Sequence, residues 1–166
     1  VAGGQAVRTP AGGSFLLGGT RASSPSERGI RAAGDGTLEP LLLQAPRKGA
    51  AMVHVAGVGL VVVGGTESAP GAELILDATT NGTSSIRPLA TNADPRTGLA
   101  LANWDSQRVL IAAEDGSLAL LDTVCAPTCP TTPLPALPPA THRTAVASAV
   151  NDVLVGGVEA GSFVVR

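Results

Sequence analysis

The sequence predicts an all-β protein built from about four copies of one small antiparallel sheet, and three observations carry this prediction. Apolar residues make up 44% of the 166 residues, far more than a disordered chain contains. Glycine and proline, with 21 and 13 residues, interrupt the chain too often for long helices. An apolar run that ends in a pair of small residues recurs at nearly constant spacing.

The recurring run is clearest where it ends in two glycines. These pairs are Gly18-Gly19, Gly64-Gly65 and Gly156-Gly157, and Ala112-Ala113 takes their place once in between. The steps between the pairs are 46, 48 and 44 residues (18 to 64, 64 to 112, 112 to 156). Periods of this size are typical of propellers and some solenoids, whereas leucine-rich and ankyrin repeats are shorter.

Other residues keep the same phase. In three of the units an arginine precedes a short segment of small residues, and in two of them a later apolar run ends in an acid. These residues are Arg47, Arg96 and Arg143, followed by Asp77 and Asp122. A last run contains proline, which confines it to a sheet edge because proline cannot donate a ladder hydrogen bond. Each unit therefore has four short strands in the order of a β-propeller blade from axis to rim.

The phase of Arg47 and the runs 61–65 and 74–77 resemble a kelch repeat, and this resemblance covers essentially the whole chain. The tyrosine and tryptophan that kelch blades usually carry after the diglycine are missing. Locally, residues 112–122 look like the Asp-Gly hairpin of quinoprotein-type propeller repeats, and residues 34–38 echo them. Asp-Gly is also a general hairpin signal, so ordinary turn chemistry is the favoured interpretation.

The whole chain is interpreted as a single propeller region. Its approximate units are 1–46, 47–94, 95–140 and 141–166, the last lacking its outer strand. Either four blades close on themselves, or the chain forms part of a ring of six to eight blades completed by another segment or chain. We favour the second, because an open ring exposes two apolar blade faces and the kelch resemblance implies larger rings.

Composition argues against several partners. A net charge of −2, with 14% charged residues and no tyrosine, lacks the basic and aromatic footprint of nucleic-acid binding. No apolar stretch approaches the roughly 18–20 residues of a transmembrane helix, and no signal peptide opens the sequence. Lysine occurs once, at Lys48, and with the excess of alanine, glycine and proline this indicates a bacterial, high-GC coding bias.

Cys125 and Cys129 are the only cysteines and lie in the loop between the third and fourth strands of the third unit. The loop can bring their Cα atoms within disulfide range, and we expect a disulfide and therefore an extracytoplasmic location, whether periplasmic, outer-surface or secreted. The alternative is a reduced pair of small apolar residues. A metal site would need two further ligands, and neither a metal nor another cofactor is expected.

The remaining candidate residues favour structural roles. His54 and His142 lack an evident carboxylate or nucleophile partner, so no catalytic residue is expected. The in-phase arginines could form a charged ring around the axis, but pairing with acids such as Asp77 or Asp122, or capping carbonyl groups between blades, is favoured. Trp104 is expected in a hairpin, where it either contacts a partner or covers the turn.

The predicted function is a non-enzymatic interaction or assembly module that binds a protein partner, or the remaining blades of the same propeller. Blade loops suit this role, and the long segments expected to carry the contacts are Thr20–Arg28, Thr66–Ala72 and Cys125–Pro139. One alternative is a lyase or hydrolase with a site at the axis. Another is a carbohydrate-binding module, although such modules normally use several aromatic platforms. The missing tyrosine excludes a complete kelch-fold copper radical oxidase.

Overall fold

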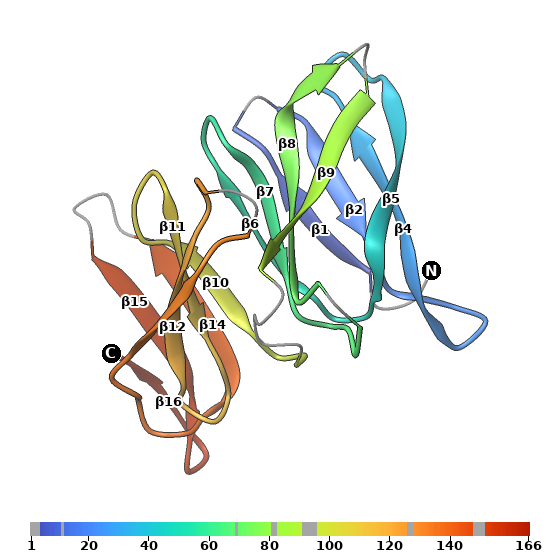
Figure 1. Cartoon of the computed structure of the whole chain (residues 1–166). Coiled ribbons are helices and arrows are strands. Elements are labelled where there is room, and N and C mark those ends of the chain that lie inside the picture. Colours follow the sequence, from blue (N-terminus) through green and yellow to red (C-terminus); the bar gives the residue numbers. More distant parts are fainter. Residues whose placement is uncertain are drawn as a thin grey trace.

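The computed structural model describes residues 4–10, 12–68, 70–80, 83–90, 96–125, 128–147 and 152–166. Every regular element within these ranges is a β-strand, and the strands form four antiparallel sheets. The sheets are the blades of a four-blade β-propeller (Figure 1), which confirms the fold class predicted from the repeat. No helix in the described part of the chain is long and apolar enough to cross a membrane.

The first two blades span residues 5 to 90. Blade 1 contains β1 (Gln5–Arg8), β2 (Ser14–Leu17), β3 (Thr20–Arg21), β4 (Ser24–Ala32) and β5 (Leu38–Arg47). Blade 2 contains β6 (Ala51–Val55), β7 (Gly59–Val63), β8 (Ala72–Thr80) and β9 (Thr83–Ala90). The short β3 pairs with the start of β4, so part of the segment expected as the loop Thr20–Arg28 is a hairpin.

The last two blades follow the same plan. Blade 3 contains β10 (Ala100–Asn103), β11 (Arg108–Ala112), β12 (Leu118–Asp122) and β13 (Thr131–Leu134). Blade 4 contains β14 (Thr141–Ala147), β15 (Val153–Glu159) and β16 (Ser162–Val165). The innermost strands of successive blades lie next to each other: β1 contacts β6, β6 contacts β10, and β10 contacts β14.

The described residues form three apolar core layers, one between each pair of successive blades. In each blade, alternate residues of the second strand point to opposite sides of the sheet. We call the side that faces the preceding blade the backward face, and the side that faces the following blade the forward face. Backward faces carry Leu60 and Val62 in blade 2, Val109 and Ile111 in blade 3, and Val155 in blade 4. Forward faces carry Phe15 and Leu17 in blade 1, Val61 and Val63 in blade 2, and Leu110 and Ala112 in blade 3.

This two-sided burial explains why the second strands are continuously apolar rather than alternating. All five residues of β7 are buried, because blade 1 covers one side of the strand and blade 3 covers the other. In β2, by contrast, Phe15 and Leu17 are buried while Leu16 is 50% exposed. The difference shows that only one side of blade 1 is covered.

The repeat register in blade 3 differs by one residue from the alignment on small-residue pairs. Val63 pairs with the first residue of β6, and Ala112 pairs in the same way with the first residue of β10. Ala113 is therefore the counterpart of Gly64. Gly64 has a φ of 73°, which favours glycine, whereas Ala113 is not among the positive-φ residues, so alanine is tolerated there.

The two Asp-Gly sequences both form tight turns that join neighbouring strands. In each turn the aspartate Oδ1 accepts a hydrogen bond from the backbone nitrogen two residues on, over 2.9 Å from Thr37 to Asp35 and from Ser117 to Asp115. The glycines adopt similar φ angles of 86° at Gly36 and 91° at Gly116. Their surroundings differ, because a Cβ atom on Gly116 would lie 1.9 Å from the Leu137 carbonyl oxygen, whereas Gly36 faces open space.

Alanine at these two glycines separates backbone strain from close packing. Gly36→Ala should destabilise the fold by about 1–2 kcal/mol, the cost of a left-handed conformation for a residue with a Cβ atom. Gly116→Ala should cost a further ~1 kcal/mol or more, because the segment that follows β13 must move away. Urea unfolding followed by circular dichroism measures both. Equal losses for the two variants would contradict the close approach of Leu137.

Candidate functional site

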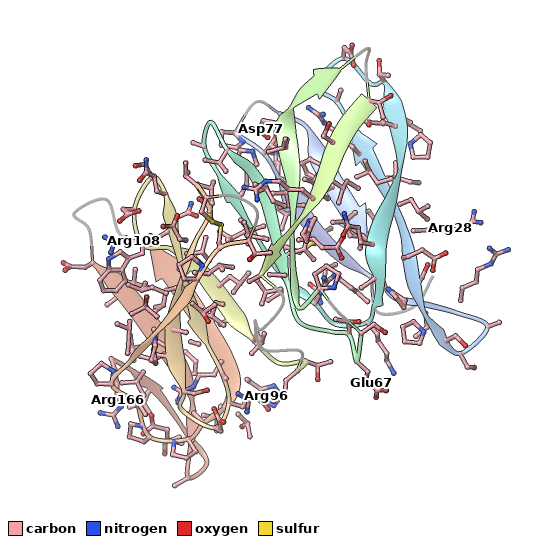
Figure 2. All side chains as sticks on the ribbon, viewed as in Figure 1. Arg28, Glu67, Asp77, Arg96, Arg108 and Arg166 are labelled. Atoms are coloured by element: carbon pink, nitrogen blue, oxygen red, sulfur yellow. A yellow bond between two sulfur atoms is a disulfide. The ribbon has the colours of Figure 1, made fainter. Side chains whose placement is uncertain are left out.

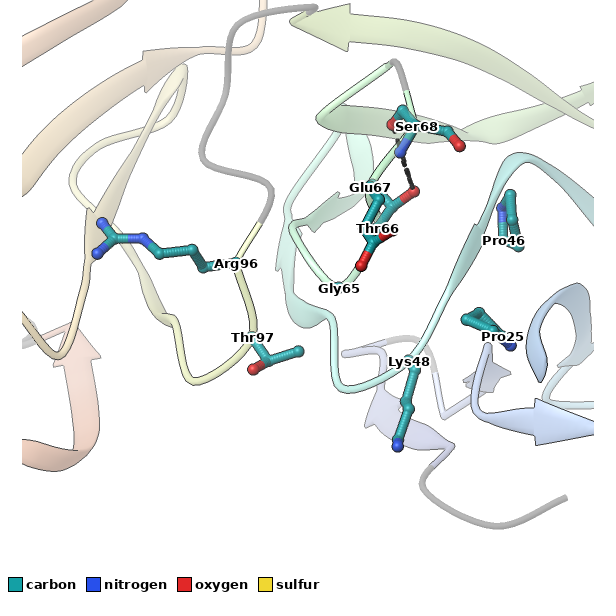
Figure 3. A pocket seen from close by; sticks show the side chains of 9 residues that line it. All are labelled: Pro25, Pro46, Lys48, Gly65, Thr66, Glu67, Ser68, Arg96 and Thr97. Atoms are coloured by element: carbon teal, nitrogen blue, oxygen red, sulfur yellow. Dashed lines mark hydrogen bonds between the residues drawn. The ribbon is translucent and has the colours of Figure 1, made fainter. Parts of the chain in front are cut away.

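A depression opens at one end of the blades, where connections from three blades meet (Figure 3). The loop between β7 and β8 supplies residues 65–68, the end of β5 and the connection into β6 supply Pro46 and Lys48, and the connection into β10 supplies Arg96 and Thr97. Pro25 of β4 completes the lining. Two of the three segments predicted to carry contacts, Thr20–Arg28 and Thr66–Ala72, therefore contribute to one site, whereas Cys125–Pro139 contributes no lining residue.

Backbone hydrogen bonds hold these connections together. The backbone nitrogen of Lys48 donates to the Gly65 carbonyl over 2.7 Å, and that of Gly65 donates to the Arg96 carbonyl over 2.9 Å. Gly65 thus ties the entry to blade 2 to the entry to blade 3. It cannot be replaced easily, because a Cβ atom there would lie 2.6 Å from the Ala50 nitrogen and the φ angle is 68°.

Arg47, whose side chain is fully buried, binds the loop between β7 and β8 that lines the depression. Nη1 donates to the carbonyl groups of Gly64 and Gly71 over 2.6 and 3.2 Å, and Nη2 donates to that of Pro70 over 2.8 Å. Nε and Nη2 also donate to Glu73 Oε1 over 3.0 and 2.7 Å. All five guanidinium donors are therefore satisfied, three of them by the loop that lines the depression.

Glu73 completes this cluster from β8. Its side chain is also fully buried, and its carboxylate accepts hydrogen bonds from the backbone nitrogens of Gln44 and Ala45 over 2.7 and 3.3 Å. Both of these residues belong to β5, so the ion pair joins the outer strand of blade 1 to blade 2. Glu73 was not singled out in the sequence. The available signal was its alternation with Ile75, which places an acid at a core-facing position of a strand.

The rim of the depression is exposed and carries charges of both signs. Lys48, Glu67 and Arg96 are all exposed, and Figure 2 shows Glu67 and Arg96 at the same end of the molecule. Arg96 donates to Asp115 Oδ2 over 2.6 Å and to Ser117 Oγ over 3.2 Å. The hydrogen bonds from Arg96 and Ser117 lower the pKa of Asp115 well below its ordinary value. Exposed charges of both signs on a hydrogen-bonded backbone can bind a partner that carries polar or charged groups.

The three in-phase arginines occupy different environments. Arg47 is fully buried, whereas Arg96 is exposed. Arg143 is buried and donates from Nε to the Ala113 carbonyl over 3.2 Å and from Nη2 to the Pro138 carbonyl. The acid bound to Arg47 is Glu73, a residue outside the set of strand-end acids. The three guanidinium groups therefore do not form a uniform ring of charge.

The predicted strand-end acids have other partners. Asp77 accepts a hydrogen bond from His54 Nε2 over 2.8 Å, and Asp122 accepts one from the Val124 backbone nitrogen over 2.9 Å. His54 therefore does have a carboxylate partner, which a separation of 23 positions concealed in the sequence. His142 is exposed, and its backbone nitrogen donates to Glu114 Oε1 over 3.0 Å.

Two buried polar atoms near the contact of β6 with β10 have no hydrogen-bond partner in the structure, His54 Nδ1 and Asn103 Oδ1. Asn103 Nδ2 donates to the His54 carbonyl over 3.0 Å, so the two residues are neighbours. Asn103 was not a predicted site residue, and its position in a short run of small residues gives little signal. The arrangement links two innermost strands and lies outside the depression.

Cys125 and Cys129 form a disulfide, with their Cα atoms 5.4 Å apart (the yellow bond in Figure 2). Cys129 is buried in the layer between blades 2 and 3, and its backbone nitrogen donates to the Leu89 carbonyl over 2.5 Å. A ligand oxygen of Asp122 lies within 4.8 Å of both sulfur atoms. Because both sulfurs are bonded to each other, this group offers no thiolate to a metal ion.

Trp104 lies in the hairpin between β10 and β11, where its backbone nitrogen donates to the Arg108 carbonyl over 2.9 Å. The indole is half-buried and packs against the layer between blades 3 and 4. It is therefore part of the cover of this layer, at the end of blade 3 away from Arg96.

The six glycines of the predicted diglycines occupy two kinds of position. Gly18, Gly19, Gly64 and Gly65 have positive φ angles, whereas Gly156 and Gly157 lie within β15.

Comparison with known proteins assigns no family. No protein-family model matches the chain, and no curated protein is significantly similar to it. The class that the fold and the site define is a four-blade β-propeller with a depression between three blades and a disulfide in one outer loop.

The buried ion pair under the depression predicts a large effect of a small substitution. Glu73→Gln should destabilise the fold by about 3–5 kcal/mol, because Arg47 would remain buried without a counter-charge. Glu67→Gln, which makes the same chemical change on the exposed rim, should change stability by no more than about 0.5 kcal/mol. Urea unfolding of both variants measures the difference. Similar small effects would show that the pair does not support the loop.

Proposed function

We propose that this protein is a non-enzymatic interaction module that binds a protein partner at the loop end of blades 1 to 3. The observation that carries the proposal is the depression to which three blades contribute. Its loop is held by a fully buried arginine, while Lys48 and Glu67 are exposed at its rim and Arg96 is ion-paired with Asp115 beside it. The phase of the repeats supports blades of kelch-like type, with the quinoprotein-type repeat as the second choice.

Rigidity supports this role. Binding costs free energy when loops and side chains must be ordered, and a prearranged surface avoids part of that cost. Here the Lys48 and Arg96 backbones are tied to Gly65, and Arg47 binds the carbonyl groups on both sides of the 65–70 loop. A partner would therefore meet exposed polar side chains on a backbone that is already fixed.

The alternative functions have weaker support. The specific feature that favours a lyase or hydrolase is the His54–Asp77 hydrogen bond, but neither residue lines the depression. A carbohydrate-binding module would stack sugars on aromatic rings at its site, but none of the described aromatic residues lines the depression and Trp104 is half-buried in an apolar layer. Turnover of an ester, glycoside or uronate substrate that is lost in His54→Ala would favour the enzyme over the interaction module.

We also propose an extracytoplasmic location. Disulfides persist in oxidising compartments and are rare in the cytosol of mesophiles. The Cys125–Cys129 disulfide lies against blade 2, with Cys129 only 3% exposed, so it is integrated into the fold rather than attached to a free loop.

Exchanging the two charges on the rim should weaken partner binding at least tenfold. The double variant Lys48→Glu/Glu67→Lys keeps the net charge, but places the wrong sign opposite each partner group. Such like-charge contacts cost several kcal/mol, so capture of a stoichiometric partner by tagged protein should fall at least tenfold. The matched control is Glu159→Arg/Arg166→Glu, which exchanges the members of an ion pair on blade 4 and should retain capture. Equal capture by wild type and the rim variant would contradict the proposed site.

Thiol labelling tests the location. Protein taken from its native compartment in the presence of an alkylating agent, without reductant, should show no modified cysteine, because both sulfurs are bonded to each other. After unfolding and reduction, mass spectrometry should show two modified cysteines. Two modified cysteines before reduction would indicate a reducing compartment and would contradict the proposed location.

A further inference from the structure

The layers between blades end at two uncovered apolar faces. On blade 1 this is the backward face, which carries Leu16, Ile30, Leu38 and Leu42, and on blade 4 it is the forward face, which carries Leu154, Phe163 and Val165. These seven side chains are 45–67% exposed. Figure 1 shows that blades 2 and 3 separate the two faces. Among the described strands, β14 and β1 do not pack together in the way that the innermost strands of successive blades do.

The strand registers establish that each set lies on one face. Leu16 pairs with Ile30 and Ile30 with Pro40, and cross-strand partners point to the same side of a sheet. Leu38 and Leu42 flank Pro40 at alternate positions, so they share this side. On blade 4, Phe163 pairs with Val158 and Val165 with Gly156, on the same side as Leu154 and opposite to the buried Val155.

The two uncovered faces are one backward face and one forward face, the two kinds of face that pack against each other between successive blades. Leu16 occupies in β2 the position that Val62, fully buried by blade 1, occupies in β7. Leu154 occupies in β15 the forward-face position that belongs to Val61 in β7, where blade 3 buries it completely. Every interface between successive blades joins a forward face to a backward face. The free faces of one chain are therefore complementary to those of a second copy.

The shape of the blade 1 face agrees with this. An apolar depression lies on it, lined by residues of β2, β4 and β5 that include Leu16, Ile30 and Pro40. Arg28 lies at its edge and projects away from the rest of the molecule (Figure 2). The free forward face of blade 4 offers Phe163, a large and exposed apolar side chain, to fill such a hollow.

We propose that two copies of this chain associate head to tail, the forward face of blade 4 in each copy covering the backward face of blade 1 in the other. Two interfaces of one kind close a ring with two-fold symmetry. Four blades from each copy give a ring within the roughly four to eight blades that propellers use. This interface lies on the flat faces of the end blades, so it is separate from the loop end proposed to bind a partner.

The test measures the mass of the chain in solution by light scattering over a range of concentrations. Wild type should have twice the 16.4 kDa of one chain. Leu16→Glu and Phe163→Glu should each shift the species to a monomer, since each variant damages both interfaces of a closed ring. The matched control Val124→Glu changes a residue 54% exposed in a loop of blade 3 and should stay dimeric.

Mixing the two monomeric variants tests the head-to-tail arrangement. One variant retains an intact blade 4 face and the other an intact blade 1 face, so an equimolar mixture should recover a one-to-one dimer held by a single interface. Loss of the dimer in only one of the two variants would show that like faces pair, and would overturn the proposal. A wild-type monomer at every concentration, or a ladder of larger species, would also overturn it. Circular dichroism checks that both variants remain folded.

Discussion

The buried pairing of Arg47 with Glu73 is the interaction on which the loop end of this propeller depends. A charged arginine without solvent is tolerated only when each donor has a partner, and here the carboxylate and three carbonyl groups supply them. The same carboxylate accepts two backbone donors of β5. One ion pair thus joins β5 of blade 1 to β8 of blade 2 and binds both ends of the loop between β7 and β8, at Gly64 and at Pro70 and Gly71.

The Arg47–Glu73 ion pair gives the loop end a rigidity that the apolar core alone would not provide. The core is made of small aliphatic side chains, which give thin layers and few large anchors. Apolar layers hold blades together but do not specify the backbone path of a loop, because dispersion and the hydrophobic effect have no direction. Hydrogen bonds do, and the structure concentrates them on Arg47, Gly65 and Glu73, where the loop must be held.

The blades could be predicted from the sequence because their signal is local and repeated. A continuously apolar second strand, such as residues 59–63, must be covered on both sides. The repeat period and the position of proline then give the order of the other strands in each blade. The site could be predicted only in part. Arg47 was found by its phase, whereas its partner Glu73 and the His54–Asp77 contact depend on which residues of non-adjacent strands face each other. The glycine pairs also misled the blade 3 register by one residue, because Ala113 does not need a positive φ.

The same alternation that builds the core also gives each blade a direction. Because forward and backward faces use opposite sides of one strand, a row of blades always ends in two unlike faces, and an uncovered apolar face of either kind favours association. Leu16 and Leu154 show that both kinds remain uncovered here. The loop end points along the blades rather than across them, so covering the end faces leaves Lys48 and Glu67 accessible. Assembly and partner binding are therefore compatible in one molecule, and a two-fold ring would present two partner sites on one side of the disc.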